Sequence, residues 1–339
     1  MPDYTPPPRI LVVRFSSIGD VVLTTPLLRA LKARHPDAEI TYVTKTEMAP
    51  LVADHPAVSR VIALEPGGSL PGLAGRLRRL HFTHRMDLHG TLRAGLLRFL
   101  VPGTWSGFDH HRRERRILIA TKQDTYTDHR PVAERYFEAA ASLDVTPDGK
   151  PAELFVSTEA QQTVATWLTE AGMDGKRLAI LAPGAAHFTK RWPAEEWVAL
   201  ARRLTADRFA VALVGGDADR PLCEVIASQT GVRAAVAAGR FGLQDTGALL
   251  RRAQVAVSGD TGVMHMATAS GTPVVALMGP TVHQFGFFPY QARSIVLERP
   301  LDCRPCTAHG GPVCPLGHHH CLRQIEAGTV AAAVERLLA

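Results

Sequence analysis

The sequence lacks the features that mark membrane-spanning and secreted proteins. No run of about 18 apolar residues is free of charges, Gly or Pro, which excludes a membrane-spanning helix. The first nine residues, MPDYTPPPR, lack the basic and then apolar pattern of a secretory signal, and we expect a frayed lead-in to the first strand. These absences favour a cytoplasmic protein whose contact with a membrane is at most peripheral.

The composition also excludes a disordered, fibrous or disulfide-stapled chain. Of the 339 residues, 46% are apolar and 21% are charged, as in an ordinary globular protein. The five cysteines do not suggest a disulfide framework. At about 100–200 residues per domain, the length favours two domains with separate cores.

Positive charge is concentrated in one stretch of the chain. Lys and Arg number 38 against 32 Asp and Glu, which gives a net charge of +6. Between Arg60 and Arg116 there are eleven basic and four acidic residues, so this stretch alone accounts for the surplus. Such a patch suits an anionic partner. Nucleic acid is disfavoured, because no recognised binding module or interleaved aromatic set accompanies the patch.

Short apolar, β-branched runs alternate with longer segments of helical period, which is typical of βαβ units. In the first half the pattern predicts strands at 10–15, 38–43, 58–64 and 85–88, and helices at 21–34, 47–54, 73–80, 92–101 and 131–143. In the second half it predicts strands at 178–182, 210–214, 255–258 and 274–278, and helices at 159–171, 193–204, 221–229, 244–253 and 262–269.

This order of elements predicts an α/β protein with two doubly wound parallel sheets. The stretch DVTPDGKP at 144–151 has no periodicity and is the best linker candidate. We place the boundary so that residues 1–157 form one domain and residues 158–339 the other. Open α/β sheets bind ligands beyond the carboxyl ends of their strands, so a ligand held between the two domains is expected.

The motif FSSIGD at 15–20 follows the first predicted strand. Its small residues allow a tight turn, and they place Asp20 in the loop before a helix that Thr25 and Pro26 begin. Asp20 either caps this helix or carries chemistry. A nicotinamide dehydrogenase is disfavoured, because G-x-G-x-x-G is absent and no acidic residue ends the second strand.

The motif SGDTG at 258–262 also follows a strand and opens a helix. The backbone N–H groups of Thr261 and Gly262 would suit a phosphate there. Asp260 would be repelled by that phosphate, so we expect it to accept hydrogen bonds from sugar hydroxyls. His265 lies one helical turn beyond Thr261 on the same face, as either a ligand contact or a core histidine.

The loop at 183–193 contains Lys190, one of only six lysines in the chain. Its compact ammonium suits a phosphate oxygen, although a solvated loop charge is the alternative.

Several of these motifs together resemble those of glycosyltransferase family 9, the heptosyltransferases of lipopolysaccharide synthesis. ILVVRFSSIGDVV at 10–22 is similar to the opening of that family. The further similar segments follow in the family's order and extend over nearly the full chain: DLHGTLRAGL at 87–96, residues 129–143, TKRWPAEEW at 189–197, VSGDTGVMHMATA at 257–269, GPT at 279–281 and the Cys-rich segment at 303–322.

The resemblance implies a GT-B fold, with two Rossmann-like domains that face each other across a cleft. It implies an inverting transfer of heptose from ADP-heptose to a lipopolysaccharide inner-core acceptor held by the N-terminal domain. Asp20 would be the general base, and some elevation of its pKa by burial would strengthen it. A sugar-nucleotide-binding protein or epimerase of the same fold, or transfer of another sugar, is the alternative. A pure binder needs no base at Asp20.

The resemblance also assigns the donor site and makes a catalytic cofactor unnecessary. Lys190, Thr261 and the Gly262 amide would neutralise charge on the departing nucleoside diphosphate. Asp260 would orient the donor, with Thr189 and His265 as further donor contacts. No DxD-bound metal is required, and the one such triplet, at 217–219, is expected in a loop beyond a strand.

The basic stretch would then face an anionic, lipid-linked acceptor at the inner face of the cytoplasmic membrane. Arg side chains suit carboxylates and phosphates. The alternative for each of them is a solvated helix face. The acceptor-binding candidates are Ser17, Gly19, Arg76, Arg79, Arg113 and Arg116, and Arg78, Arg112 and Arg115 lie in the same basic stretch.

Four cysteines lie within nineteen residues near the end of the chain, with a run of three histidines in the last gap. The spacing resembles a zinc knuckle, but the second pair is wider than the usual two to four residues. Structural zinc, a redox disulfide and free buried thiols remain open, and no catalytic role is assigned. The candidate metal ligands are Cys303, Cys306, Cys314 and Cys321.

Overall fold

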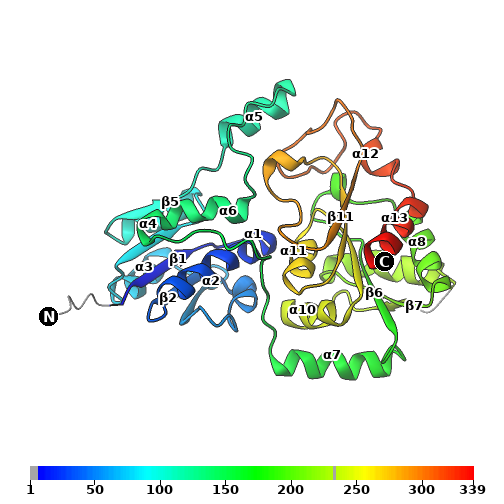
Figure 1. Ribbon diagram of the computed structural model, residues 1–339, viewed down its shortest axis with the longest axis horizontal. Coiled ribbons are helices and arrows are strands. Elements are labelled where there is room, and N and C mark those ends of the chain that lie inside the picture. Colours follow the sequence, from blue (N-terminus) through cyan, green and yellow to red (C-terminus); the bar gives the residue numbers. More distant parts are fainter. Residues whose placement is uncertain (1–6, 232–233) are drawn as a thin grey trace. The chain divides into compact units, whose positions relative to one another are not determined.

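The structure is a computed structural model that describes residues 7–231 and 234–339 (Figure 1). The chain divides into two compact units: Met1–His110 with Val132–Phe155, and His111–Pro131 with Val156–Ala339. The chain passes from the first unit to the second for the last time after Phe155, close to the predicted boundary at 157. Most of the predicted lead-in at 1–9 lies outside the described residues.

The first unit is built on a five-stranded parallel sheet of order β3-β2-β1-β4-β5. All side chains of β1 from Ile10 to Val13 are buried, as expected for a parallel strand covered on both faces. The strand order reverses between β1 and β4, the switch point at which such sheets bind ligands. The strands are β1 (Arg9–Val13), β2 (Glu39–Lys45), β3 (Arg60–Leu64), β4 (His84–Asp87) and β5 (Trp105–Gly107).

Helices α3 (Leu70–Arg78) and α4 (Leu92–Leu100) pack on one face of this sheet. Leu77 of α3 and Leu97 of α4 share an apolar core with Leu11 and Val13 of β1. The remaining helical elements of the unit are α1 (Ile18–Val22), α2 (Thr25–Arg34), α6 (Val132–Arg135) and the 3₁₀ segments η1 (Thr46–Leu51) and η2 (Tyr136–Leu143).

The helix predicted at 21–34 is in fact two helices, α1 and α2, and the first begins three residues earlier than the pattern indicated. Pro26 has no N–H to donate to the Val22 carbonyl, so the first helix cannot continue. The Thr25 hydroxyl donates to that carbonyl instead, at 2.8 Å. The Thr24 hydroxyl donates in the same way to the Val21 carbonyl, at 2.7 Å. Asp20 therefore lies inside α1 and not in a loop.

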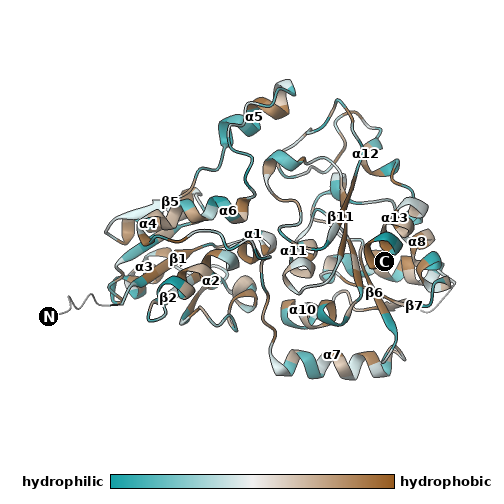
Figure 2. Cartoon of the chain, viewed as in Figure 1, coloured by the Kyte–Doolittle hydropathy of each residue, from teal (hydrophilic) through white to brown (hydrophobic). Residues whose placement is uncertain are grey.

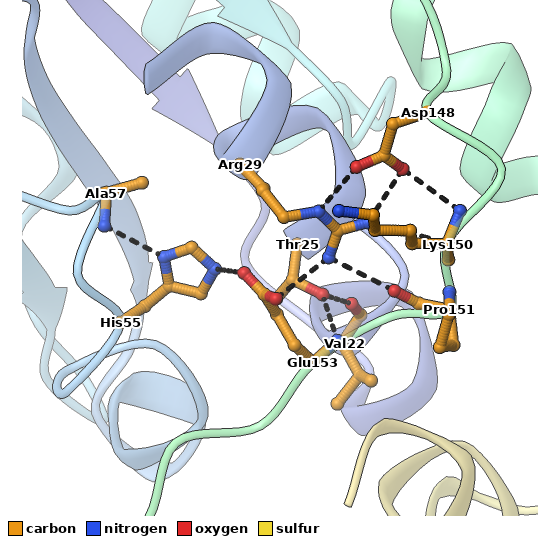
Figure 3. Close-up of polar contacts among 9 residues, drawn as sticks. All are labelled: Val22, Thr25, Arg29, His55, Ala57, Asp148, Lys150, Pro151 and Glu153. Carbon is orange, nitrogen blue, oxygen red and sulfur yellow. Dashed lines mark hydrogen bonds and ion pairs between the residues drawn. The ribbon is translucent and has the colours of Figure 1, made fainter. Parts of the chain in front are cut away.

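The linker predicted at 144–151 and the residues after it are bound to α2 (Figure 3). The Arg29 guanidinium donates to the Asp148 carboxylate at 2.8 and 2.9 Å and to the Glu153 carboxylate at 2.8 Å. Glu153 also pairs with His55 at 3.0 Å. This part of the linker is therefore fixed to the first unit.

The second unit has a six-stranded parallel sheet of order β11-β10-β9-β6-β7-β8, in which β6 and β9 flank the switch point. The strands of both units are largely hydrophobic (Figure 2). They are β6 (Arg177–Ala182), β7 (Phe209–Leu213), β8 (Ala234–Val236), β9 (Val255–Gly259), β10 (Val274–Met278) and β11 (Ser294–Glu298).

One face of the second sheet is covered by α8, α9 and α13, with Trp197 of α8 and Val334 of α13 in the shared core. Helices α7, α10 and α11 contact one another in turn. The helical elements are α7 (Thr158–Glu170), η3 (Phe188–Lys190), α8 (Ala194–Ala206), η4 (Asp217–Asp219), α9 (Arg220–Gln229), α10 (Leu243–Arg252), α11 (Gly262–Ala269), η5 (His283–Phe285), α12 (His320–Arg323) and α13 (Ala327–Leu338). No helix in the described ranges is long and apolar enough to cross a bilayer.

Residues 111–131, which we expected in the N-terminal domain, group with the second unit. They contain helix α5 (Arg112–Thr121), which the pattern did not predict. Leu118 and Tyr126 form a small core with Phe285. The Lys122 ammonium donates to the carbonyl of Pro305 at 2.6 Å. These contacts explain why the segment belongs to the second unit.

Candidate active site

Asp20 lies at the carboxyl edge of the first sheet, where α1 begins after β1. Its Oδ2 accepts hydrogen bonds from the Ser17 backbone N–H at 3.1 Å and from the Ser17 hydroxyl at 2.7 Å. The acidic side chain in the first turn also suits the positive end of the helix. Asp20 thus takes part in capping α1 and not, as one interpretation of the sequence held, in capping the helix that Thr25 and Pro26 begin; its other oxygen has a different partner.

That partner is Arg14, which the sequence analysis did not single out. Its Nη2 lies 2.5 Å from Oδ1 of Asp20, and only 10% and 16% of the two side chains are exposed. Arg14 Nη1 donates to the carbonyl of Leu88, which directly follows β4. The guanidinium therefore joins Asp20 to both strands of the switch point. A lone charged residue at the end of an apolar strand was the signal that could have identified it.

Electrostatics keep the Asp20 carboxyl ionised. Burial alone would raise its pKa, but the Arg14 cation and the Ser17 donors outweigh burial, and the pKa lies below its ordinary value. The elevation by burial that would strengthen Asp20 as a base is therefore absent. Burial, and next the charge of Arg14, lower the pKa of the nearby His89 to about 4, so this imidazole is neutral at neutral pH.

In the second unit, Lys190 and Asp260 form an ion pair. The Lys190 ammonium lies 2.7 Å from Oδ2 of Asp260, and 15% and 10% of the side chains are exposed. The same carboxylate oxygen accepts a hydrogen bond from the Thr281 hydroxyl at 2.6 Å. Lys190 follows β6 and Asp260 follows β9, so the pair lies at the switch point of this sheet. The solvated-charge alternative for Lys190 does not apply.

Gly259 allows this approach. A Cβ at Gly259 would lie 3.0 Å from the Lys190 carbonyl oxygen, closer than side chains normally come to a backbone. Any larger residue at this position would push the lysine loop away from the end of β9.

Helix α11 begins at Gly262 with Thr261 as its N-cap, as predicted. The Thr261 side chain is hydrogen bonded to the Ser258 hydroxyl at 3.0 Å and not to the helix backbone. The first N–H groups of the helix have no partner within the helix itself, which suits an anion. His265 is 3% exposed with its ring 6.5 Å from that of Phe287, so it is a buried residue of the helix.

Thr189, the other donor-binding candidate, is bound to the Cys-rich segment. Its hydroxyl accepts from the Gly311 N–H at 2.8 Å and donates to the Gly311 carbonyl at 3.3 Å. The ring Nε2 of His319 lies 3.1 Å from the Thr189 carbonyl oxygen. Thr189 thus fixes the lysine loop to the tail, and its contact with a donor stays a prediction.

The acceptor-binding candidates do not form one group. Arg76 and Arg79 are exposed at the end of α3 in the first unit. Arg113 and Arg116 are exposed on α5, which groups with the second unit and not with the expected acceptor domain. Ser17 and Gly19 lie beside Asp20 on α1 and at its N-cap.

The cysteine cluster gives no support to the structural zinc. All five cysteines are free, and in the part of the chain that the structure describes no three His, Cys, Asp or Glu side chains are placed to hold a metal ion. Burial raises the pKa of Cys321 to about 11 and also raises that of Cys306. The Asp217–Asp219 triplet forms the turn η4 after β7, where Asp219 accepts from the Gly216 N–H at 3.0 Å.

Comparisons with known proteins agree on one family. A sequence profile described as glycosyltransferase family 9 (heptosyltransferase) matches residues 72–315. Lipooligosaccharide heptosyltransferase 2 of Haemophilus influenzae is 27% identical over 297 residues, which cover 81% of this chain and 84% of that protein.

Two solved structures share the fold. The family 9 glycosyltransferase of Veillonella parvula is 25% identical, with a TM-score of 0.83 over 98% of both chains. ADP-heptose lps heptosyltransferase II of Escherichia coli is 23% identical, with a TM-score of 0.75 over 97% of this chain and 98% of that one. The predicted GT-B fold is confirmed. The family profile covers well over half of the chain, so the protein is a glycosyltransferase that belongs to glycosyltransferase family 9.

Proposed function

We propose that this enzyme transfers heptose from ADP-heptose to a lipopolysaccharide inner-core acceptor, with inversion at the anomeric carbon. The relatives from Haemophilus influenzae and Escherichia coli are a lipooligosaccharide and an ADP-heptose lipopolysaccharide heptosyltransferase. The observation that carries the proposal is the ionised Asp20 carboxylate, held by Arg14 and Ser17 at the switch point of the first sheet.

Asp20 is the general base of the proposed reaction. Ser17 occupies Oδ2 with two hydrogen bonds, while Oδ1 has Arg14 as its partner and a second lone pair for an acceptor hydroxyl. The proton of that hydroxyl passes to Asp20 as its oxygen bonds to the anomeric carbon. The bond from that carbon to the β-phosphate oxygen breaks, and ADP leaves with the electron pair.

The second unit binds the donor. The N-terminus of α11, with the amides of Thr261 and Gly262, receives the diphosphate, and the Lys190 ammonium offsets the charge that develops on it. Asp260 accepts hydrogen bonds from donor hydroxyls. The Lys190 ammonium lies 2.7 Å from the Asp260 carboxylate, so its positive charge offsets the repulsion between this carboxylate and the proposed anionic ligand. The proposed chemistry needs no cofactor.

The acceptor is an anionic saccharide on a lipid, bound by the first unit at the inner face of the cytoplasmic membrane. The net charge of +6 favours an anionic partner of this kind. In this proposal the enzyme is a cytoplasmic protein with a peripheral membrane contact, and nucleic acid is not a partner.

The test replaces Asp20 by Asn in the full-length enzyme, with Asp37→Asn as the control because Asp37 is exposed. General-base catalysis is worth about 10²–10⁴ in rate, so we expect kcat to fall by at least about a hundredfold while ADP binding persists. Activity that survives within about tenfold would reject Asp20 as the base. Loss of ADP binding would instead indicate a folding defect, which circular dichroism would detect.

The donor is tested separately. A thermal-shift screen should show a larger stabilisation by ADP-heptose than by other sugar nucleotides, and NMR of the product should show the inverted anomeric configuration. Equal stabilisation by all nucleotide sugars, with no transfer product, would favour the binding-protein alternative.

A further inference from the structure

Helix α4 of the first unit exposes a row of large apolar side chains to solvent. Leu92 is 96% exposed, Phe99 is 82% exposed and Leu96 is 50% exposed. The three residues have the spacing i, i+4 and i+7, which places them on one face of a helix. Two of them are more than 80% exposed, so within residues 7–231 and 234–339 this face has no packing partner. We name Leu92, Leu96 and Phe99 the apolar row.

The apolar row is not the face with which the helix binds its own sheet. Ala94 and Leu97 are at most 1% exposed and belong to the core beneath the helix. At 3.6 residues per turn these two positions lie on the side of the helix opposite the apolar row. The helix therefore has two apolar faces, and the outer one contributes nothing to the core.

Basic residues border the apolar row on both sides. By the same helical geometry, Arg93 and Arg98 lie on opposite flanks of the helix, between the apolar row and the buried face, and both are exposed. Arg98 lies nearer the buried face, and its Nη1 is 3.8 Å from Oδ2 of Asp87. Residues 70–100, which include α3 and α4, contain six arginines and a single acidic residue, Asp87. Asp87 is 3% exposed, so it contributes little negative charge at the surface. The surroundings of the apolar row are thus strongly cationic.

The helix also begins at the catalytic edge of its sheet. Only four residues separate the end of β4, at Asp87, from Leu92. The first of them, Leu88, accepts the hydrogen bond from Arg14, the partner of Asp20. At the same edge, Lys45, Glu65 and other residues line with Arg93 a pocket of about 460 Å³. The apolar row thus starts four residues after Leu88, the residue that joins the Arg14–Asp20 pair to the end of β4.

We propose that α4 is a membrane-docking helix, with the apolar row inserted among the lipids of an anionic bilayer and Arg93 and Arg98 bound to headgroup phosphates. An apolar face bordered by arginines is the pattern of helices that lie in the bilayer interface. A second copy of the chain fits less well, because a face-to-face contact would bring the arginines of both copies together. The inference rests on the proposed function only in taking the acceptor to be lipid-linked.

The binding test measures sedimentation of the full-length enzyme with vesicles of phosphatidylethanolamine and phosphatidylglycerol. The variant carries Leu92→Ser, Leu96→Ser and Phe99→Ser together. The control carries Val313→Ser and Leu316→Ser, which remove exposed apolar side chains elsewhere on the chain. Because burial of apolar surface drives insertion, we expect the partition coefficient of the triple variant to fall by at least about tenfold and that of the control to stay unchanged.

The electrostatic half of the proposal has its own measurement. Binding should weaken in phosphatidylcholine vesicles and at high salt. Arg93→Gln with Arg98→Gln should reduce that salt dependence. The proposal would be overturned if the wild-type enzyme does not bind anionic vesicles, or if the triple variant binds them as well as wild type does. Light scattering that shows a wild-type dimer and a monomeric triple variant, without vesicle binding, would assign the row to a second copy and also overturn it.

Activity assays separate this proposal from the proposed function. With a water-soluble acceptor fragment, the triple variant should turn over as wild type does, whereas with acceptor embedded in vesicles its rate should fall. If neither enzyme transfers heptose to the soluble fragment, the proposed function fails, and vesicle sedimentation still decides the role of α4. If wild type and the triple variant act equally on the embedded acceptor, docking through α4 is rejected while the transferase assignment remains.

Discussion

Nη2 of Arg14 lies 2.5 Å from Oδ1 of Asp20, and both side chains are almost entirely buried. The pair joins the last part of the first strand to the helix that follows it, and a hydrogen bond to the Leu88 carbonyl extends it to β4. The contact serves structure and chemistry together, because the charge that holds the segment in place also keeps the proposed base ionised.

The first prediction concerns Arg14→Met. Without the cation, the charged form of Asp20 loses its main stabilising partner, so its pKa should rise. The acid limb of the pH profile of kcat/KM should therefore move to higher pH, because a higher pH is then needed to ionise the base. Breaking one half of a buried pair should also lower the free energy of unfolding by about 3–5 kcal/mol.

Arg14→Lys is the matched variant. Lysine keeps the positive charge but lacks the planar guanidinium. The acid limb should therefore lie close to its wild-type pH, while only part of the lost free energy of unfolding is recovered. The measurements are pH–rate profiles and urea unfolding. An acid limb that stays at the wild-type pH in Arg14→Met would show that Asp20 is not the group that titrates in the profile.

The second prediction concerns coupling between Lys190 and Asp260. Lys190→Met leaves a largely buried carboxylate uncompensated next to the nucleotide site, and Asp260→Asn removes it. A double-mutant cycle on ADP affinity, measured by calorimetry, should give a coupling energy of about 0.5–3 kcal/mol. The double variant should bind ADP better than Lys190→Met alone, because the unpaired negative charge is then gone. Additive losses would contradict a functional ion pair.

Much of the fold follows from the sequence, because buried parallel strands and amphipathic helices have clear periods. Strand β10 and helix α11 begin and end where the pattern predicted them. The three strands that were missed, β5, β8 and β11, are either only three residues long or, as in β11, not fully buried along their length. Short or half-exposed strands leave too little period-2 signal to recognise.

The candidate site was predictable in part. Motifs placed Asp20, Lys190 and Asp260 after strands, but the pair of Lys190 with Asp260 depends on β6 lying next to β9, and local patterns do not contain strand order. At Asp20 the sequence analysis considered burial, which raises the pKa, but not the charge of Arg14 six residues earlier, which lowers it. Residues 111–131 were misassigned because their grouping depends on the tertiary core of Leu118 and Phe285.

The third prediction concerns the linker. Arg29→Met removes hydrogen bonds to Asp148 and Glu153 (Figure 3) and should lower the free energy of unfolding by roughly 1–3 kcal/mol. Limited proteolysis near 144–151 should become faster. Arg34→Met is the control: its pair with Asp144 is exposed, so its loss should change the free energy of unfolding by less than about 0.5 kcal/mol. Equal proteolysis of both variants would contradict the anchoring role.

The same contacts give a pH dependence. Hydrogen bonds from Arg29 lower the pKa of Asp148, and at Glu153 the His55 and Arg29 partners outweigh burial and lower the pKa as well. A carboxyl with a lowered folded-state pKa stabilises the protein above its unfolded pKa, near 4, and that contribution disappears as the pH falls through the folded pKa. The stability difference between wild type and Arg29→Met should therefore shrink in acid.

The fourth prediction orders the thiols by reactivity. Burial raises the pKa of Cys321 to about 11 and that of Cys223 to about 12, whereas Cys303 and Cys314 are partly exposed. Thiolates are the reactive form, so in titration with a thiol reagent near pH 8 the exposed pair should react at least about tenfold faster. Mass spectrometry of the labelled peptides gives the order. A disulfide, or stoichiometric zinc in protein purified without a His tag, would contradict the free thiols.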